Sequence, residues 1–378
     1  MVRKRLAYVS LTCFIDHDLP ILKEFARHYK TVWYLLSCDN EKKYTIDEVA
    51  TYSAKHDIEF RSFHYRARFR NPKNLLFDTS IVFEIKRTQP DIIYFEGFWD
   101  PYFPFVARLF LPQRCTIVGI HDVVPHEGPK KLSFRLHNAV IFGLFRNFHL
   151  FSHAQQKIFL EKYRHKRSFV AGLYLLDFGE FPGSLAKDQS LVTFLFFGLI
   201  RQNKGLEFLI EAGNALAERA RGFRILIAGE CMETVDYGSM IRHPRVFDLR
   251  LGMVPNSDIP RLFSEADFLV LPYRDVTQSG PLMIALRYGL PVIASDLAGF
   301  REYVEPGETG FLFEPCNSHD LCLAMERILA LSMQEREQMH LNVLSFSGQR
   351  VSLEKIIESY RCFFEDLSNE SGQRVTQN

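Results

Sequence analysis

The sequence contains no run of the roughly 18 apolar residues that a membrane-spanning helix needs, so no segment is expected to cross a bilayer. Its seven cysteines are odd in number and scattered, with no C-x-x-C pair. This argues against a disulfide framework and a structural zinc site, and it favours reduced thiols in a cytoplasmic protein. The formal net charge of +1 gives no whole-molecule field that would attract nucleic acid.

Two phosphate-binding signatures are also missing. The Walker spacing G-x-x-x-x-G-K-[ST] does not occur around Lys204-Gly205. No G-x-G-x-x-G follows the first predicted strand, at 6–11. The second absence argues against a nicotinamide-dependent enzyme, because that motif forms the tight turn that approaches the pyrophosphate.

Length and composition favour a globular protein with two domains. The 378 residues exceed what one ordinary core accommodates, and 47% hydrophobic with 24% charged residues is typical of globular chains. Short apolar runs alternate with segments whose apolar residues are three and four apart, which indicates βαβ units around a parallel sheet. Strands are predicted at 6–11, 31–36, 91–95, 115–120 and 148–152, and again at 191–198, 224–228, 267–271 and 291–295.

A stretch with Gly and Pro at 177–188 interrupts this alternation and is interpreted as a linker. The sequence therefore predicts an α/β protein with one Rossmann-like domain at 1–182 and a second at 188–352, facing each other across a ligand-binding cleft. A last helix at 353–367 is expected to pack back on the first domain, and residues 368–378 are expected to be a disordered tail. The basic start of the chain is interpreted as the first strand and not as a signal peptide.

The segment Tyr273-Arg-Asp-Val-Thr-Gln-Ser-Gly-Pro281 lies between a predicted buried strand and a predicted helix. Gly280 allows a close backbone approach, and Pro281 suits the first helical turn, where its missing N–H would be unpaired anyway. A helix N-terminus has unpaired N–H groups and a positive dipole end, and the hydroxyls of Thr277 and Ser279 add donors. The segment is therefore a candidate phosphate site, and the alternative is an ordinary helix cap at Ser279.

A second loop, Phe197-Gly-Leu-Ile-Arg-Gln-Asn-Lys-Gly205, follows another apolar strand and places Arg201 and Lys204 before a helix. A guanidinium fork and an ammonium together suit a diphosphate held without a metal ion. The alternative is a surface turn with solvated cations. Because the carboxyl ends of parallel strands share one sheet edge, two anion-suited loops in one domain predict a single site.

The second half of the chain resembles the retaining glycosyltransferases of family 4, which have the two-Rossmann-domain GT-B architecture. The resemblance is strong over 191–329 and only suggestive before it. Five ordered segments carry it: Phe197 to Gly205, Ile225-Leu-Ile-Ala-Gly-Glu230, Leu271 to Asp275, Gly289-Leu-Pro-Val-Ile-Ala-Ser-Asp296, and Gly299-Phe-Arg-Glu302 with Gly307-Glu-Thr-Gly-Phe-Leu312. It implies that the second domain binds a nucleotide sugar, with no metal ion and no other cofactor.

The resemblance also assigns roles to single residues. Arg201 and Lys204 would bind the donor diphosphate, and His121, at the end of a strand in Val118-Gly-Ile-His-Asp122, would lie near the donor sugar and the reacting centre. The other donor-binding candidates are Gly198, Gly205, Gly229, Glu230, Thr277, Gln278, Ser279, Gly280 and Glu302. The alternatives are a core or capping histidine at 121 and a surface role for Glu302.

One feature of the family is absent. Two glutamates usually flank this loop, eight positions apart, and the second normally holds the ribose hydroxyls. Here the two positions are Val276 and Ile284. The segment Tyr-Arg-Asp-x-Thr-Gln-Ser-Gly resembles a variant subgroup without that glutamate, so the way in which ribose is held is left open. Asp275 is adjacent to the first position, but its side chain need not point the same way.

The acceptor side is expected in the first domain, where 61–73 interleaves cations with aromatic residues. Arg66, Arg68 and Arg70 suit an anionic membrane surface or the pyrophosphate of a lipid carrier. The composition suits single-stranded nucleic acid equally well, and a solvated loop is a further alternative. His126 is a second histidine candidate on this side.

Two more segments of the first domain, 103–111 and 132–151, are rich in Phe and Leu. Core packing is the more frequent reason for such a composition, and an apolar face toward lipid is the alternative.

The expected function is sugar transfer from a UDP- or GDP-sugar to a hydroxyl acceptor with retention, in polysaccharide, capsule or lipid-linked glycan biosynthesis. Arg201, Lys204 and the helix end would stabilise charge on the leaving diphosphate. The expected partners are the donor, a glycan or lipid-linked acceptor and an anionic membrane surface, without nucleic acid, and the expected location is cytoplasmic and peripheral at the inner face of the membrane. The alternatives are a non-catalytic nucleotide-sugar-binding protein and a sugar-nucleotide epimerase of the same fold.

Overall fold

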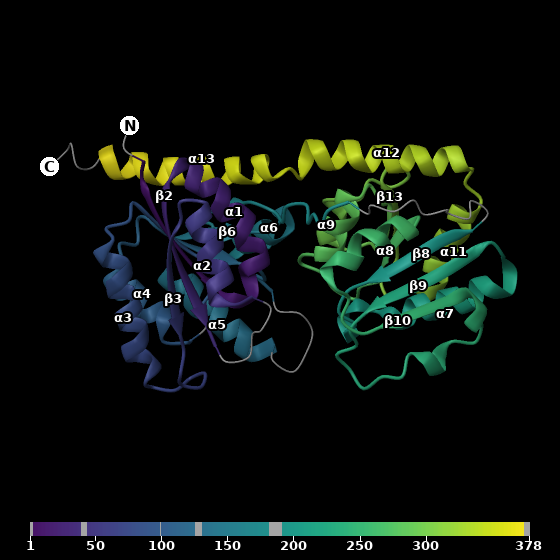
Figure 1. The fold of residues 1–378 in the computed structure, drawn as a ribbon, viewed down its shortest axis with the longest axis horizontal. Helices are drawn as coiled ribbons and strands as arrows, with labels where there is room; N and C mark the ends of the chain where they lie inside the picture. Colours follow the sequence, from purple (N-terminus) through teal and green to yellow (C-terminus); the bar gives the residue numbers. More distant parts are fainter. Residues whose placement is uncertain (1–2, 39–43, 99, 125–130, 181–190, 374–378) are drawn as a thin grey trace. The chain divides into compact units, whose positions relative to one another are not determined.

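The computed structural model describes residues 3–38, 44–98, 100–124, 131–180 and 191–373 (Figure 1). Two compact units divide the chain: unit 1 comprises Met1–Gly172 with Leu353–Asn378, and unit 2 comprises Leu173–Ser352. Each unit is built around one parallel sheet, so the predicted α/β fold with two Rossmann-like domains is confirmed. Among the helices of the described residues, none combines the length and apolar character that crossing a bilayer requires.

The sheet of unit 1 has seven parallel strands in the order β3-β2-β1-β4-β5-β6-β7. The strands are β1 (Arg5–Leu11), β2 (Lys30–Ser37), β3 (Glu59–His64), β4 (Ile92–Phe95), β5 (Thr116–Ile120), β6 (Asn147–Leu150) and β7 (Arg167–Val170). The helices are α1 (Ile15–His28), α2 (Ile46–Lys55), α3 (Asn74–Arg87), α4 (Phe103–Phe110), α5 (Lys131–Leu144), α6 (His153–Lys162) and α13 (Leu353–Gln373).

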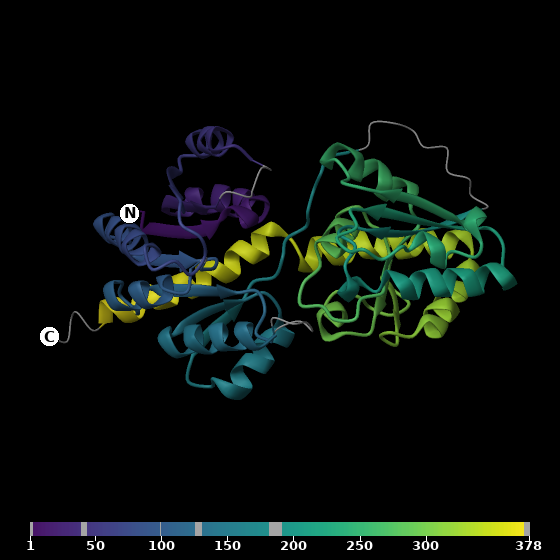
Figure 2. The same cartoon turned by 90° about the horizontal axis from the view of Figure 1, so that it is seen from below.

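Alternation along the strands separates the two faces of this sheet. Ala7 and Val9 of β1 belong to the core under α3, α4 and α5. Tyr8, between them, points to the opposite face, where it contacts Phe25 of α1. On that face Phe25 also contacts Tyr360, so α13 completes the core of unit 1 beside α1 (Figures 1 and 2). The structure thus brings the late helix α13 to the first domain, and it continues to Gln373, where the sequence analysis placed a tail from 368.

The sheet of unit 2 has six parallel strands in the order β10-β9-β8-β11-β12-β13. The strands are β8 (Val192–Phe197), β9 (Phe223–Gly229), β10 (Phe247–Leu251), β11 (Phe268–Leu271), β12 (Val292–Ser295) and β13 (Gly310–Phe313). The helices are α7 (Leu206–Arg219), α8 (Ile259–Glu265), α9 (Gly280–Arg287), α10 (Ala298–Arg301), α11 (Ser318–Leu329) and α12 (Met333–Arg350). Helices α7 and α11 share one core cluster, and α8, α9 and α12 share the other, so both faces are covered.

Candidate active site

The loop after β8 meets the loop after β11 at the edge of the unit 2 sheet where both strands end. Lys204 Nζ lies 3.8 Å from the centroid of the Tyr273 ring. The N–H of Arg274 donates to the carbonyl of Asn203 over 2.9 Å, and Asn203 Nδ2 donates to Asp275 Oδ1 over 3.3 Å. The two loops that the sequence analysis assigned to one site therefore lie in direct contact.

Two glycines allow close backbone contacts at this edge of the sheet, Gly205 between the loops after β8 and β11 and Gly229 between the ends of β9 and β8. Gly205 has a φ of +62°, and a Cβ there would lie 2.0 Å from the carbonyl oxygen of Pro272. Gly229 has a φ of +153°, and a Cβ there would lie 1.8 Å from the carbonyl oxygen of Gly198. Both glycines therefore serve close contacts between loops, because any side chain would force the loops apart.

Lys204 is a half-buried cation whose pKa the fold lowers. Burial lowers the pKa of its ammonium to about 8; the charge of Asp275 opposes this shift and the charge of Arg201 adds to it. Arg201 itself is exposed at the start of the short 3-10 turn Gln202–Lys204. An incoming anion would raise the pKa of Lys204 again and stabilise its charged form, so this loop is suited to bind phosphate.

The start of α9 supplies neutral donors beside the lysine. Ser279 is the N-cap, and its Oγ accepts the N–H of Leu282 over 3.3 Å, so this oxygen is already engaged by the helix. Gln278 Nε2 is buried and has no hydrogen-bond partner among the described residues. A buried amide donor of this kind needs a partner, and a bound ligand at the helix end would provide one. Thr277 and Gly280 are half-buried in the same segment.

The structure also places the two positions where the family has glutamates. Ile284 is buried in the core under α9, and Val276 packs against Gly299, whose Cβ would lie 3.2 Å from Val276 Cγ1. With isoleucine and valine at these two positions, neither side chain can offer a polar group to a ligand. Glu302 is the half-buried C-cap of α10, the helix that begins beside this loop, whereas Glu230 is exposed after β9.

In unit 1, the neighbouring strands β4 and β5 each end at a polar residue of a second candidate site. Glu96 follows β4 and His121 follows β5, and His121 Nε2 lies 3.0 Å from Glu96 Oε1. The imidazole is stacked between Phe14, with centroids 4.6 Å apart, and Phe151, with centroids 4.2 Å apart. The ring therefore has a fixed plane and a fixed partner for one nitrogen.

Glu96 is fully buried and carries its charge there. Burial alone would raise its pKa, but the imidazole of His121, 3.0 Å away, and the other nearby histidines outweigh burial and lower the pKa to about 2. Its other oxygen, Oε2, accepts the hydroxyls of Tyr94 over 2.6 Å and Tyr8 over 3.2 Å. The carboxylate is thus held from both sides, which fixes the atom that faces His121.

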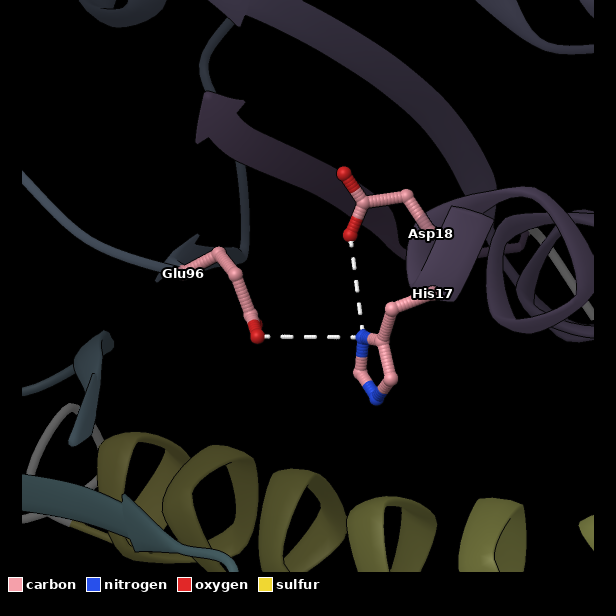
Figure 3. Close-up of side chains that lie close together, drawn as sticks. All are labelled: His17, Asp18 and Glu96. Carbon is pink, nitrogen blue, oxygen red and sulfur yellow. Dashed lines mark ion pairs between the residues drawn. The ribbon is translucent and has the colours of Figure 1, made fainter. Parts of the chain in front are cut away.

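His17 and Asp18, from the first turn of α1, lie next to Glu96 (Figure 3). His17 Nδ1 lies 3.7 Å from Glu96 Oε1 and 3.9 Å from Asp18 Oδ1. Burial lowers the pKa of His17, but the nearby carboxylates of Asp18 and Glu96 outweigh this and raise it. One ligand atom from each residue lies within 4.8 Å of the others, a spacing that a metal ion would accept. The single hydroxyl proton of Tyr8 is shared between Asp18 Oδ1 at 2.8 Å and Glu96 Oε2 at 3.2 Å, so the geometry is better explained as internal charge compensation.

A tyrosine–histidine network extends from this cluster to the end of the chain. His149 Nδ1 lies 2.7 Å from the Tyr94 hydroxyl and 3.2 Å from the Tyr360 hydroxyl of α13, and Nε2 lies 2.8 Å from the carbonyl oxygen of Ala171. Burial lowers the pKa of His149 to about 3, although the charge of Glu96 opposes the shift. His149 is therefore neutral and serves as a hydrogen-bonding core residue.

The basic stretch of unit 1 is partly strand. Arg61 lies in the edge strand β3 and forms ion pairs with Glu59 and Glu84. Arg66, Arg68 and Arg70 are all exposed in the connection to α3. The guanidinium of Arg70 lies 5.1 Å from the centroid of the Phe69 ring. His126 lies outside the described residues.

Sequence reasoning did not find Glu96. The sequence did contain a signal for Glu96, because apolar packing cannot explain a carboxylate directly after the buried run Ile92-Ile-Tyr-Phe95. The partners that explain it come from β1, α1 and β5, which are distant in the sequence.

Unit 2 is similar in sequence to known proteins. Residues 192–331 match the model of the family described as glycosyl transferases group 1. Over 161 residues the chain is 28% identical to the alpha-D-kanosaminyltransferase of Streptomyces kanamyceticus, which covers 42% of each chain. Over 125 residues it is 33% identical to the GDP-mannose:glycolipid 4-beta-D-mannosyltransferase of Xanthomonas campestris, which covers 32% of this chain and 35% of that one. The chain thus spans about two-fifths or less of the length of these relatives.

Solved structures extend the likeness to both units at the level of fold. A glycosyltransferase of Rickettsia africae has a TM-score of 0.71 at 14% identity and covers 97% of this chain and 98% of its own. HepE of Anabaena, in complex with UDP and glucose, has a TM-score of 0.70 at 16% identity and covers 96% of this chain and all of its own. The two-domain architecture is therefore the GT-B fold.

Proposed function

We propose that this protein is a glycosyltransferase that moves a sugar from a nucleotide-diphosphate sugar, of the UDP or GDP type, to a hydroxyl group of an acceptor. The observation that carries the proposal is the contact between the two loops of unit 2, which gathers Lys204, Arg201 and the start of α9 at one sheet edge. This edge belongs to the segment that matches the glycosyl transferases group 1 model. The named donors of relatives support it: GDP-mannose for the Xanthomonas enzyme and UDP-glucose for HepE.

The chemistry of this edge suits a leaving diphosphate. When the bond between the anomeric carbon and the diphosphate oxygen breaks, negative charge develops on that oxygen. The ammonium of Lys204, the guanidinium of Arg201 and the N–H groups at the start of α9 stabilise such charge without moving. In the protein without a ligand Lys204 has a pKa of about 8, so a diphosphate that binds beside it also draws the lysine toward its protonated form.

We assign His121 to the donor sugar and the reacting centre, with Glu96 as its positioning residue. Glu96 Oε1 faces Nε2 at 3.0 Å, so the carboxylate occupies this side of the imidazole. The remaining nitrogen, Nδ1, is then the one that is left to meet a bound molecule. The flanking rings of Phe14 and Phe151 keep the imidazole in this plane.

Retention of the anomeric configuration and independence of metal ions remain part of the proposal. They derive from the resemblance to family 4, and the names of the relatives include both an alpha- and a 4-beta-glycosyl product. Product stereochemistry is read directly from the anomeric coupling in proton NMR, and activity in the presence of a chelator tests the need for a metal. An inverted product contradicts same-face attack.

The acceptor is proposed to be a glycan or a lipid-linked glycan in polysaccharide or capsule biosynthesis, at the cytoplasmic side of the membrane. The exposed arginines at 66, 68 and 70 and the glycolipid in the name of the Xanthomonas relative support this class. A hydroxyl acceptor with a phosphate-containing carrier would use both cations and apolar contacts of unit 1.

One observation favours a second candidate, a protein that binds nucleotide sugars without turnover. Val276 and Ile284 occupy the positions of the usual glutamates, and Ile284 is part of the core. A sensor needs diphosphate contacts but no chemistry, so Lys204 and Arg201 suit both candidates. An epimerase of the same fold would convert the donor without any acceptor.

The experiment that tests the proposal is a thermal-shift panel with UDP, GDP, ADP, CMP and their sugar conjugates, with and without magnesium, followed by an assay of donor consumption. A rise in melting temperature with one nucleoside diphosphate identifies the base. Consumption that depends on an acceptor supports the transferase. Binding without consumption supports the sensor, conversion without an acceptor supports the epimerase, and no response to any nucleotide contradicts the donor site.

A further inference from the structure

The outer surface of α4 and α5 carries apolar side chains that the core of unit 1 does not use. On α4, Phe105 and Leu109 are four residues apart, and on α5 the exposed positions 132, 136 and 140 follow the same spacing. Each helix therefore presents one apolar stripe to solvent. Leu109 is 74% exposed, Leu132 71% and Leu136 61%. We call these two stripes and the loop at 69–70 the α4–α5 face.

A hollow of about 840 Å³ lies within this face. Phe105 and Leu136 from the two stripes line it together with Phe69 and Arg70. A cavity of this size accepts groups as large as an acyl chain segment. Contiguous exposed apolar surface of this kind marks a site of interaction, whereas single exposed leucines need no explanation.

The chain around this face carries more positive than negative charge. The segments 60–77, 101–121 and 129–160 contain twelve Lys and Arg residues and no Asp or Glu, and the acids that directly flank them include Asp78, Asp100, Asp122 and Glu161. Asp78 and Asp100 are buried, and Arg61 is paired with Glu59 and Glu84. The whole-chain charge of +1 hides this asymmetry. A face with apolar stripes inside a basic frame attracts an anionic surface over a distance of about one Debye length.

A second hollow, of about 710 Å³, lies at the other ends of the same two helices. Among the described residues its lining contains no carboxylate, and its cations are Arg108, Arg114, Arg146, Lys166 and Arg167. Burial lowers the pKa of Lys166, and the positive charges of Arg146 and Arg108 add to the shift, which shows that these cations crowd one another. An anion that enters this hollow would relieve their mutual repulsion.

We propose that the α4–α5 face binds the surface of an anionic phospholipid bilayer. Phe105, Leu109 and Leu136 enter the interface between headgroups and acyl chains, while the cations around both hollows meet headgroup phosphates. Two observations favour this partner over others. A single-stranded nucleic acid stacks on aromatic rings and gains nothing from leucine stripes, and a second copy of this chain would bring like charges together.

This inference goes beyond the proposed transfer reaction and does not require it. Vesicle binding is measured without any nucleotide, so its failure leaves the donor site of unit 2 untouched. Conversely, a chain that binds no nucleotide sugar would still bind vesicles through this face.

The test is co-sedimentation of the full chain with vesicles of phosphatidylcholine alone and of phosphatidylcholine mixed with phosphatidylglycerol, at several salt concentrations. The apolar variant is Leu109→Gln with Leu136→Gln, and its control is Leu251→Gln with Met253→Gln, two exposed apolar residues of unit 2. The charge variant is Arg108→Gln with Arg146→Gln, and its control is Arg245→Gln with Arg327→Gln, two exposed arginines of unit 2. Because all eight side chains are exposed, each variant should fold, which circular dichroism checks.

Wild type and both controls should bind anionic vesicles at least about tenfold more tightly than neutral ones, since each cation near such a surface contributes about a fivefold factor. The apolar variant should lose about tenfold or more of this affinity. The charge variant should lose about twentyfold and show a weaker dependence on salt. Absence of vesicle binding by the wild type overturns the proposal.

Two other results also overturn it. If the apolar variant binds anionic vesicles as the wild type does, while soluble polyphosphate competes, the face is a site for a polyanion. If the wild type ignores vesicles and forms a dimer that the apolar variant abolishes in size-exclusion chromatography, the face is an interface between two copies.

Discussion

The candidate sites of the two units compensate buried charge in opposite ways. In unit 1, Glu96 is fully buried, but it accepts hydrogen bonds from Tyr8 and Tyr94 and lies 3.0 Å from His121, and its pKa falls to about 2. In unit 2, burial lowers the pKa of Lys204 to about 8, and the lysine faces an aromatic ring at 3.8 Å. The first charge is compensated by the protein itself, whereas the second is compensated only in part.

This difference indicates which of the two sites depends on a ligand. A buried charge that neighbouring side chains compensate makes a rigid site, and removal of one member is costly because it leaves the others uncompensated. A partly compensated cation destabilises the free protein slightly and gains most when an anion arrives. Unit 1 thus holds His121 in a fixed position, and unit 2 contains the cation that would gain from binding an anion.

The largest expected effect comes from breaking the compensated cluster. Glu96→Ala should lower the free energy of unfolding of unit 1 by about 3 to 5 kcal/mol, because it leaves buried hydrogen-bonding groups without a partner. Both tryptophans of the chain, Trp33 and Trp99, belong to unit 1, so urea unfolding followed by fluorescence reports on this unit. The control Glu161→Ala removes an exposed carboxylate of α6 and should change stability by less than about 0.5 kcal/mol. Equal stability of both variants would show that Glu96 is not compensated as described.

The next effect concerns the partly compensated cation, Lys204. Lys204→Ala should weaken donor binding by about 1.5 to 3 kcal/mol without loss of stability, because a charge-assisted contact is lost and a buried charge is removed. Isothermal titration with the nucleoside diphosphate found in the panel measures this. The control Arg274→Ala lies on the facing loop, but its guanidinium already pairs with Glu207. A larger loss for Arg274→Ala than for Lys204→Ala would move the diphosphate away from Lys204.

A pH profile sharpens the same point with a smaller effect. Lys204 is charged below its pKa of about 8, so donor affinity should fall above pH 8, by at most about tenfold per pH unit, and the Lys204→Ala variant should lack this decline. The free energy of unfolding should change with pH in the opposite direction. Between about pH 8 and the unfolded value of 10.5, the unfolded lysine holds more protons than the folded one, so stability rises with pH in this window. A wild-type affinity that is flat from pH 7 to 9.5 would contradict the depressed pKa.

The smallest effect separates capping from ligand binding at α9. Ser279→Ala should lower the stability of unit 2 by about 1 kcal/mol, because the N–H of Leu282 loses its acceptor. Donor affinity should change by less than about twofold, as thermal unfolding and titration of the same sample will show. A strong loss of affinity with unchanged stability would assign the Ser279 hydroxyl to the donor.

Buried strands were predictable from the sequence, and the strands at the sheet margins were not. Runs such as Ile92–Phe95 and Val192–Phe197 are buried over nearly their whole length, so composition alone reveals them. β3 and β10 are edge strands whose residues are mostly half-exposed and include charged side chains. Their sequences, Glu-Phe-Arg-Ser-Phe-His and Phe-Asp-Leu-Arg-Leu, therefore lack the apolar signal.

The candidate site divides in a similar way. The loops of unit 2 follow directly after buried strands, so local sequence identifies Lys204, Arg201 and the start of α9. The environment of Glu96 depends on Tyr8, 88 residues earlier, and on His121, 25 residues later. No local pattern encodes such a meeting, because sheet order and helix packing decide it. The exposed stripes of α4 and α5 were visible in composition, but only burial separates an outer face from a core face.

The contact between Tyr360 and His149 also constrains the order in which the two units can fold during translation. Unit 1 needs α13 to complete its core, yet α13 is translated after all of Leu173–Ser352. Unit 2 is continuous, so it can fold while the first 172 residues still await their last helix. Until Tyr360 and its neighbours emerge, the apolar face next to Phe25 stays uncovered. During this stage of synthesis the nascent first domain is therefore exposed to aggregation and to chaperone binding.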